Sequence, residues 1–348
     1  MKSIAIDCSK LNTLYKTGTH RFLIGFLNEL TLNKDYKFYF YVNGKDTNIK
    51  EFPFSKKGEV VALNYRFFYT QLGLLKELTK YDYFLFPWQT LPFLGFFSRA
   101  KKLSIIHDLG YSLTSFLTTI GTQLVSDAVF SVSESTATKL FRKSIVIGEG
   151  VDQRIFFPIP SIELKNKAKD LDIPAFFILS VGRIEKRKNI YNNLIAFSKI
   201  VKLYPNLKYV FIGKFVESEE KIYSFLKHLE LSNGEVLFKN NISDADLNIY
   251  LNSMEFLVFT SLDEGFGLPV LEAYSVHKPV LLSKIQQLAE FKISANQFVS
   301  PRDANKISEK MLKFLNKDHG INSKKDYQVL LDKFSWKKCS EIFLKNLK

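Results

Sequence analysis

The chain has 348 residues, which is enough for two domains of moderate size. Apolar residues make up 46% and charged residues 24%, which is typical of a globular protein. The net charge of +14 divides evenly, with 20 basic and 13 acidic residues up to position 156 and 29 and 22 after it, so +7 on each side. This even spread argues against a nucleic-acid-binding arm, which would concentrate its charge.

The apolar start, 4–6, is interrupted by Asp7 and is too short for the core of a signal peptide. The longest near-apolar run, 84–97, contains two prolines and is too short to cross a bilayer. We therefore expect a cytoplasmic protein. The two cysteines lie at opposite ends, and neither they nor the five histidines have metal-ligand spacing, so we expect no metal site.

In the first half, short apolar runs predict strands. They lie at 3–7, 36–42, 83–87, 103–106, 128–132 and 144–147, with a helix at 22–32. Residues 66–78 carry an apolar stripe at helical spacing, bordered by Arg66, Lys76 and Lys80. Packing of this stripe against the core is favoured over a membrane-surface helix. His107 directly follows a strand, at the edge where open α/β sheets bind ligands.

The second half alternates strands and helices in the same way, which predicts a parallel sheet. Strands are expected at 176–181, 208–212, 235–238, 256–260, near 279–283 and near 298, and helices at 190–203, 305–315 and after 244, 269 and 336. Residues 161–170 are charged and are expected to be exposed. Asp244-Ala-Asp246 allows a metal-site interpretation, but capping of the following helix is favoured.

Two strand-to-helix turns of the second half contain candidate ligand-binding residues. Arg183 and Lys188, five residues apart, can both reach a diphosphate lying over their turn, although a solvated basic loop is the alternative. Lys186 and Arg187 between them are expected to be exposed. In the second turn, glycines precede a helix that begins near Pro269, and such a helix N-terminus binds anions.

This second turn resembles a known signature. Glu264-Gly-Phe-Gly-Leu-Pro-Val-Leu-Glu272, followed by a Lys-Pro-Val strand, is similar to the E-x7-E motif of retaining family 4 glycosyltransferases, which have the GT-B fold. Gly182-Arg183 with Lys188-Asn189 is similar to the "VGR…KN" motif of that family, and His107-Asp-Leu to its His-Asp-Leu. Residues 148–158 resemble its crossover between domains.

The resemblance implies an α/β protein with the GT-B fold, in which two Rossmann-like domains face each other across a cleft. The first domain, 1–156, would bind the acceptor, and the second, 157–335, the nucleotide-sugar. The closing helix, 336–348, would cross back and pack on the first domain.

The activity implied is that of a retaining, metal-independent hexosyltransferase without cofactors. Arg183 and Lys188 would stabilise the diphosphate leaving group, Glu264 would lie beside the donor sugar, and His107 would contact the sugar or the acceptor. The further donor contacts implied are Gly182, Asn189, Gly265, Phe266, Gly267, Leu268 and Glu272, the last at the ribose. Gly18 stands where the family usually has a glycine-rich loop beside the phosphate and acceptor, and His20 and Arg21 either supply charge there or face solvent.

The expected partners are a GDP- or UDP-linked sugar and a glycan or lipid-linked acceptor, without nucleic acid. The His107-Asp-Leu resemblance favours mannose. Weak contact with an anionic membrane is expected, which would place the protein peripherally at the inner membrane face. The alternatives are a nucleotide-sugar epimerase, a phosphorylase of the same fold, or an inactive partner subunit of a transferase. Only the reduced glycine loop at Gly18 supports the last.

Overall fold

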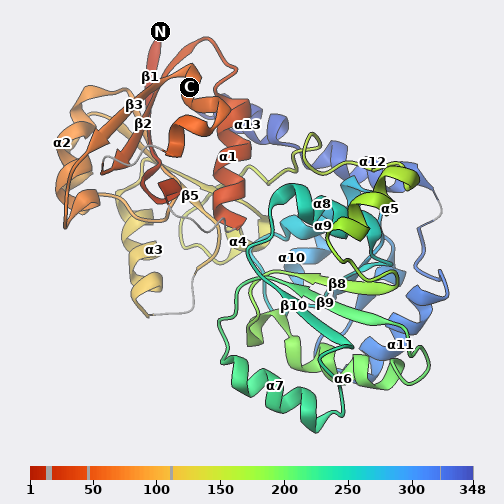
Figure 1. The fold of residues 1–348 in the computed structure, drawn as a ribbon. Coiled ribbons are helices and arrows are strands. Elements are labelled where there is room, and N and C mark those ends of the chain that lie inside the picture. The colour runs from red at the N-terminus through yellow and green to blue at the C-terminus, as the bar shows by residue number, and fades with distance from the viewer. Residues whose placement is uncertain (13–17, 45–47, 110–112, 322, 348) are drawn as a thin grey trace. The chain divides into compact units, whose positions relative to one another are not determined.

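The computed structural model describes residues 1–12, 18–44, 48–109, 113–321 and 323–347 (Figure 1). The chain forms two compact units, Met1–Gly150 with Phe334–Lys348, and Val151–Lys333. The predicted boundaries, after 156 and 335, lie a few residues further along. The segment after Gly150 goes with the second unit because the backbone N–H groups of Phe157 and Ile159 donate to Asn248 and Asn252, at 3.3 and 2.9 Å.

The first unit is built on a parallel sheet whose strand order is β3-β2-β1-β4-β5-β6-β7. The strands are β1 (Lys2–Asp7), β2 (Tyr36–Asn43), β3 (Glu59–Leu63), β4 (Tyr83–Phe86), β5 (Lys101–Ile106), β6 (Ala128–Ser131) and β7 (Ile145–Val146). The helices are α1 (Gly18–Leu30), α2 (Leu75–Glu77), α3 (Leu113–Val125), α4 (Glu134–Thr138) and α13 (Trp336–Lys345), with a π-helical turn η4 (Tyr69–Leu74) and a 3-10 turn η6 (Phe93–Phe97).

The second unit has its own parallel sheet, with the order β10-β9-β8-β11-β12-β13. The strands are β8 (Phe177–Val181), β9 (Lys208–Ile212), β10 (Val236–Lys239), β11 (Leu257–Phe259), β12 (Val280–Ser283) and β13 (Phe298–Val299). The helices are α5 (Ser161–Asp170), α6 (Ile190–Ile200), α7 (Glu219–His228), α8 (Asp244–Ser253), α9 (Leu268–Ser275), α10 (Gln286–Ala289), α11 (Ala304–Leu315) and α12 (Lys324–Lys333). Each unit is therefore a Rossmann-like α/β domain, as predicted.

Most predicted strands exist, because a strand buried on both faces of a parallel sheet is an almost continuous apolar run. The first predicted helix, 22–32, instead runs from Gly18 to Leu30. The apolar stripe at 66–78 divides, with Leu74 and Leu78 in the core and Phe67, Phe68 and Leu72 exposed. The predicted exposure of 161–170 is confirmed, since helix α5 has no buried residue.

The closing helix α13 packs on the first unit, as predicted. Ser335 caps it by accepting a hydrogen bond from the backbone N–H of Lys338 at 3.3 Å. Trp336 lies edge-on to Phe22, with ring centres 5.5 Å apart, and Phe343 contacts Phe26 at 5.2 Å. No helix in the described ranges combines the length and apolar character needed to cross a bilayer.

The contact between α1 and α13 depends on Gly25. A Cβ atom at this position would lie 2.3 Å from the Trp336 indole. Replacing glycine by alanine inside a helix normally raises the unfolding free energy by about 1 kcal/mol. Here we expect Gly25→Ala to lower it by about 1–3 kcal/mol, because the added methyl group overpacks the contact with Trp336. Thermal melting checks this, with Gly234→Ala as control, since a Cβ there meets nothing closer than 3.7 Å. A melting temperature for Gly25→Ala at or above wild type would contradict the packing argument.

Candidate functional site in the second unit

The site lies where the strand order of the second sheet reverses. Strands β8 and β11 are neighbours, and the chain proceeds outward from them in opposite directions. Open α/β sheets bind ligands at such a point, beyond the carboxyl ends of the strands. A pocket is present there, lined by Ser180, Val181, Gly182, Arg183, Ile184, Lys188, Ile190, Phe211, Val258, Phe259, Thr260 and Ser261.

Two glycines allow the backbone to form this pocket. A Cβ atom on Gly213, at the end of β9, would lie only 1.8 Å from the carbonyl oxygen of Gly182, so only glycine permits this close approach. Gly267 has φ of 121° and forms the N-cap of α9, a conformation that favours glycine. The N-terminal N–H groups of α9 are thereby presented beside the end of β11, where they can bind an anionic or hydroxyl-bearing ligand.

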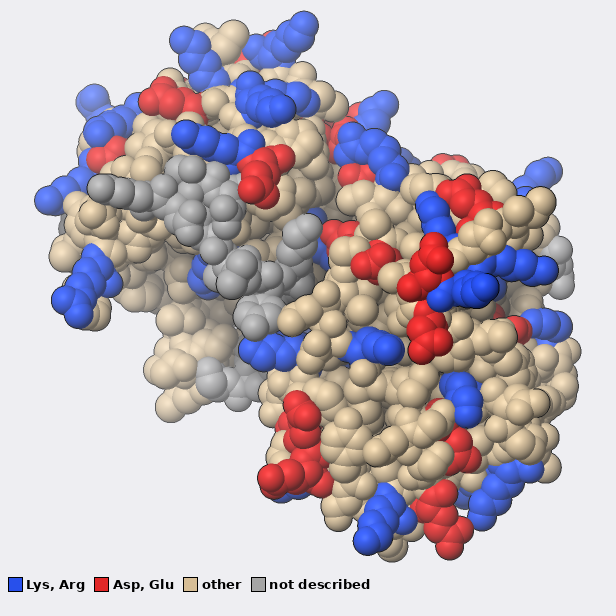
Figure 2. Space-filling model, viewed as in Figure 1, with Lys and Arg blue, Asp and Glu red and all other residues tan. Residues whose placement is uncertain are grey.

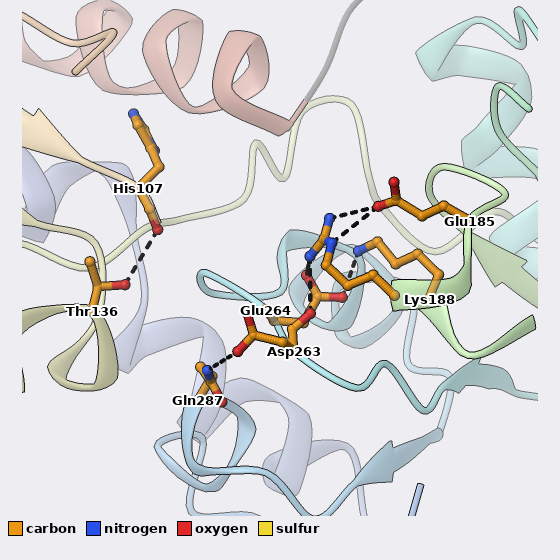
Figure 3. Close-up of polar contacts among 8 residues, drawn as sticks. His107, Thr136, Glu185, Lys188, Asp263, Glu264 and Gln287 are labelled. Carbon is orange, nitrogen blue, oxygen red and sulfur yellow. Dashed lines mark hydrogen bonds and ion pairs between the residues drawn. The ribbon is translucent and has the colours of Figure 1, made fainter. Parts of the chain in front are cut away.

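Glu264 is the buried charge of the site, with 7% of its side chain exposed. Its Oε1 accepts a hydrogen bond from the Lys188 Nζ at 2.5 Å, and its Oε2 lies 3.4 Å from Arg187 Nη1. Lys188 Nζ also lies 5.1 Å from the centre of the Phe259 ring, where a cation is attracted to the ring face. The structure thus brings together Lys188 and Glu264, which the sequence places in separate turns (Figure 3).

Arg187 was predicted to be exposed, and this prediction is wrong. Only 20% of its side chain is exposed, because its guanidinium bridges the two turns. It donates to the carbonyl oxygen of Asp263 at 2.9 Å and forms an ion pair with Glu185 at 3.0 Å. Asp263 in turn accepts a hydrogen bond from Gln287 of α10 at 2.6 Å (Figure 3). Arg187 therefore holds the Glu264 loop in place.

The other predicted donor residues occupy varied positions. Arg183 is exposed at the pocket and forms no ion pair within the described part of the chain. Asn189 is buried, and its amide donates to the carbonyl oxygen of Pro301 at 2.6 Å, so it holds the turn. The side chains of Phe266, Leu268 and Glu272 are buried, while Gly182 lines the pocket and Gly265 lies between Glu264 and Phe266.

The alternative metal interpretation of Asp244 and Asp246 gives way to the predicted cap. Ser243 is the N-cap of α8, and its hydroxyl accepts from the backbone N–H of Asp246 at 3.0 Å. The same hydroxyl donates to the Asp246 carboxylate at 2.7 Å. This arrangement accounts for Asp246, and Asp244 lies in the same first turn of α8, where acidic residues are favoured.

In the first unit, His107 follows β5 as predicted. Its Nε2 lies 3.1 Å from the carbonyl oxygen of Pro87, and its Nδ1 lies 3.8 Å from Glu149. The Phe22 ring and the imidazole pack edge to face, with centroids 4.7 Å apart. Gly18 is the first residue of α1, and residues 13–17 before it lie outside the described ranges.

His20 does not face solvent, so that expectation for it is wrong. It is buried, and its Nε2 lies 2.7 Å from the carbonyl oxygen of Lys10. Burial lowers the pKa of its imidazole below 6.5, which favours the neutral ring at pH 7. Its ring lies 5.5 Å from that of Trp88.

The sequence reasoning missed Asp7, at the point where the strand order of the first sheet reverses, between β1 and β4. The carboxylate is buried and accepts a hydrogen bond from the backbone N–H of Ser9 at 3.0 Å. Burial raises the pKa of Asp7 from 3.8 to about 6, although this hydrogen bond opposes the shift. Trp88, after β4, donates its indole N–H to the carbonyl oxygen of Asp7 at 2.7 Å. A charged residue closing an apolar strand was the signal that could have found this site.

Comparison with known proteins finds similar chains. Residues 162–328 match the family model of glycosyl transferases group 1. This segment contains both turns of the site and is similar to members of that family. The whole chain has the GT-B fold. It matches the Anabaena protein HepE, solved in complex with UDP and glucose, with a TM-score of 0.80 and 14% identity over 100% of this chain and 99% of that one. It also matches a sucrose-phosphate synthase from Thermosynechococcus elongatus, with a TM-score of 0.77 and 18% identity over 99% and 98%.

Among curated proteins, the serotype-specific mannosyltransferase WbdA of Escherichia coli is 30% identical over 222 residues, covering 61% of this chain. The match spans 27% of the length of WbdA. The O-antigen chain mannosyltransferase B of the same organism is 27% identical over 47% of this chain and 43% of its own. The capsular polysaccharide glycosyltransferase CapM of Staphylococcus aureus is 27% identical over 63% and 60%.

Removal of the Arg187 guanidinium should loosen the Glu264 loop. We expect Arg187→Ala to raise amide hydrogen exchange at 262–266 about tenfold, because local opening then breaks fewer charged hydrogen bonds. Exchange measured by mass spectrometry checks this. Arg154→Ala is the matched control, since it removes a surface ion pair with Asp152. Unchanged exchange at 262–266 would show that the loop does not depend on Arg187.

Asp7 should make stability depend on pH with a defined sign. Its folded-state pKa, about 6, lies above the usual 3.8, so the folded chain holds a proton that the unfolded chain has lost between these values. The unfolding free energy should therefore fall as pH rises from about 4 to 6, by about 3 kcal/mol, and stay low above pH 6. Asp7→Asn should be the more stable protein at pH 8 and lose this advantage at pH 4.

Denaturant unfolding across this pH range measures the effect of Asp7. The exposed Asp35→Asn serves as the control, because a solvated carboxylate undergoes no comparable burial. A difference between Asp7→Asn and wild type that does not vary with pH would refute the assignment.

Proposed function

We propose that the chain is a retaining glycosyltransferase that moves a hexose from a nucleotide diphosphate sugar to an acceptor hydroxyl. The observation that carries this proposal is the contact of Glu264 with Lys188, which lines the pocket at the β8–β11 reversal together with the exposed Arg183. A pocket with two cations and a helix N-terminus suits a diphosphate, and the neighbouring carboxylate suits sugar hydroxyls.

In the proposed reaction, the bond between the anomeric carbon and the diphosphate oxygen breaks while a bond to the acceptor oxygen forms on the same face. The acceptor proton passes to the departing phosphate, so no side chain is needed as base. Charge develops on the leaving group, and Arg183 and Lys188 are the groups that stabilise it. These two cations replace the charge that a divalent metal would bring, so we propose metal-independent transfer without a cofactor.

The remaining roles follow from position. The backbone N–H groups of Phe266, Gly267 and Leu268 bind sugar hydroxyls or phosphate at the start of α9, and Glu272 accepts from the ribose hydroxyls. Gly182 and Gly265 let the donor approach the backbone. The amide of Asn189 is bonded to Pro301, so we assign it to shaping the turn. In the first unit, His107 contacts the sugar or acceptor, and Gly18 lies on the acceptor and phosphate side.

For the donor sugar we propose mannose, because WbdA and the O-antigen chain mannosyltransferase B are named as mannosyltransferases. GDP is then the expected nucleotide, whereas HepE was solved with UDP. The acceptor proposed is a glycan or glycolipid, met at the cytoplasmic face of the membrane by a peripherally bound protein.

The diphosphate assignment predicts the effect of removing either cation. Arg183→Ala and Lys188→Ala should each lower turnover about 10²-fold, as expected for loss of one charged donor to a transition state. Release of nucleoside diphosphate from GDP-mannose and from UDP-sugars, with a glycan acceptor, measures this.

The control for both cation variants is Lys186→Ala, whose side chain is exposed in the same turn. Normal turnover in the Arg183→Ala, Lys188→Ala double variant would remove the basis of the proposed function.

A further inference from the structure

Helix α3 of the first unit turns its polar side to the interior and its apolar side to the surface. Its inward residues are Thr119, Thr122 and Gln123, and its exposed large residues are Leu113, Phe116, Leu117 and Leu124. A helix on a water-facing surface normally turns its apolar side to the core. All of its 13 residues are uncharged.

The inward polar groups are satisfied where they lie. Thr119 donates to the carbonyl oxygen of Ser115 at 2.9 Å, and Thr122 donates to that of Gln89 at 2.8 Å. At the other end, Arg142 donates to the carbonyl oxygen of Ser126 at 2.6 Å, just beyond the helix C-terminus. The bonds of Thr122 to Gln89 and of Arg142 to Ser126 hold the polar side of α3 against the unit, and its apolar face points away from the unit.

This face continues onto neighbouring elements. The Phe93 ring of η6 lies against Gly121 of α3, where an added Cβ would come within 2.5 Å of it. Gln71 of η4 bonds to the backbone on both sides of Pro92, donating to Leu91 and accepting from Phe93, each at 3.0 Å. We call the resulting set the α3 surface. Its exposed members are Phe67, Phe68, Leu72, Phe93, Leu94, Phe96, Leu113, Phe116, Leu117, Leu124 and Phe141.

Most of the exposed phenylalanine side chains in the described ranges belong to the α3 surface. Of the seven phenylalanines that are exposed within the described ranges, six belong to it. Contiguous exposed apolar groups of this kind mark an interaction site. Figure 2 shows the region around α3, at the left of the view near mid-height, as largely tan, whereas blue and red atoms are frequent elsewhere on that face.

Basic side chains border the α3 surface. Arg66 precedes Phe67, and its guanidinium lies 5.4 Å from the centre of that ring. Arg99 follows η6, and Lys143 lies two residues beyond Phe141, both exposed. Phenylalanine and leucine surrounded by cations is the arrangement of protein surfaces that enter the headgroup region of anionic membranes.

We propose that the α3 surface binds the interface of an anionic lipid bilayer. A protein partner would require matched hydrogen bonds, at about one per 100–200 Å² of interface, but the polar groups of α3 are engaged inward and Thr118 donates to Ser115 of its own helix. A bilayer requires no such matching. The inference deepens the proposed function, on which it rests only for the choice of a lipid-linked acceptor. It assigns membrane contact to α3 and η6 together with the exposed residues Phe67, Phe68 and Leu72.

The test is co-sedimentation of the full chain with vesicles of phosphatidylglycerol and phosphatidylcholine in equal parts. Wild type should pellet with these vesicles at low salt and bind much less to pure phosphatidylcholine, because the cations add to apolar insertion. Phe116→Ser with Leu117→Ser should reduce the bound fraction about tenfold or more, because two large apolar groups no longer enter the lipid. Serine leaves the net charge unchanged, so any loss reports apolar insertion.

The matched control is Ile162→Ser with Leu203→Ser, two exposed apolar residues of the second unit, which should bind as wild type does. The proposal would be overturned if the α3 variant bound vesicles as well as wild type does, or if the control variant lost as much binding as the α3 variant. It would also be overturned if wild type did not pellet with vesicles at all. A wild-type dimer that the α3 variant dissociates, without vesicle binding, would instead identify a self-association surface. Transfer to a water-soluble acceptor should be unchanged in the α3 variant, and its absence in wild type would count against the proposed function alone.

Discussion

The site in the second unit depends on the ion pairs that neutralise one buried carboxylate, that of Glu264. Glu264 lies at the carboxyl end of β11, and an isolated buried charge of this kind would be strongly unfavourable. Lys188, at 2.5 Å, and Arg187, at 3.4 Å, come from the turn after the neighbouring strand β8. Because these strands pair in parallel, both turns emerge at one edge of the sheet, and the ion pairs can form. The two motifs are therefore one structural unit, although 76 residues separate the paired side chains.

Sequence patterns correctly predicted the elements that depend on local sequence, such as strands and helix caps. Strands such as β8 and β9 are apolar runs ended by glycine, and the caps at Ser243 and Ser335 precede helices in the usual way. The pairing of Lys188 with Glu264 could be anticipated only through a family resemblance, because no local pattern shows which strands are neighbours. Arg187 was misjudged for the same reason, since its partners Asp263 and Glu264 lie far along the chain.

Helix α3 escaped the sequence analysis for a different physical reason. Periodicity identifies a helix by an apolar stripe facing the core, bordered by charged residues. Here the stripe faces outward and the inward positions carry threonine and glutamine, so the segment resembles neither a surface helix nor a loop. Asp7 was overlooked because the one local signal, a carboxylate at the end of an apolar strand, does not show that the side chain is buried, and burial is a property of the assembled sheet.

Each sheet has a carboxylate near the point where its strand order reverses, and the surroundings of the two carboxylates differ in charge. In the second unit, Lys188 and Arg187 contact Glu264, and a third cation, the exposed Arg183, lines the pocket with Lys188, where it can pair with an anionic ligand. In the first unit, burial raises the pKa of Asp7 to about 6 and lowers the pKa of His20, so each charged form is less favourable there than it is in water. The nearby Trp88 and Tyr69 add ring faces and a hydroxyl. Charged donors suit a diphosphate, whereas Asp7 and Trp88, which are 1% and 6% exposed, bond to groups inside the first unit. This difference in electrostatics agrees with the proposed division of labour, in which the second unit binds the nucleotide-sugar and the first unit the acceptor.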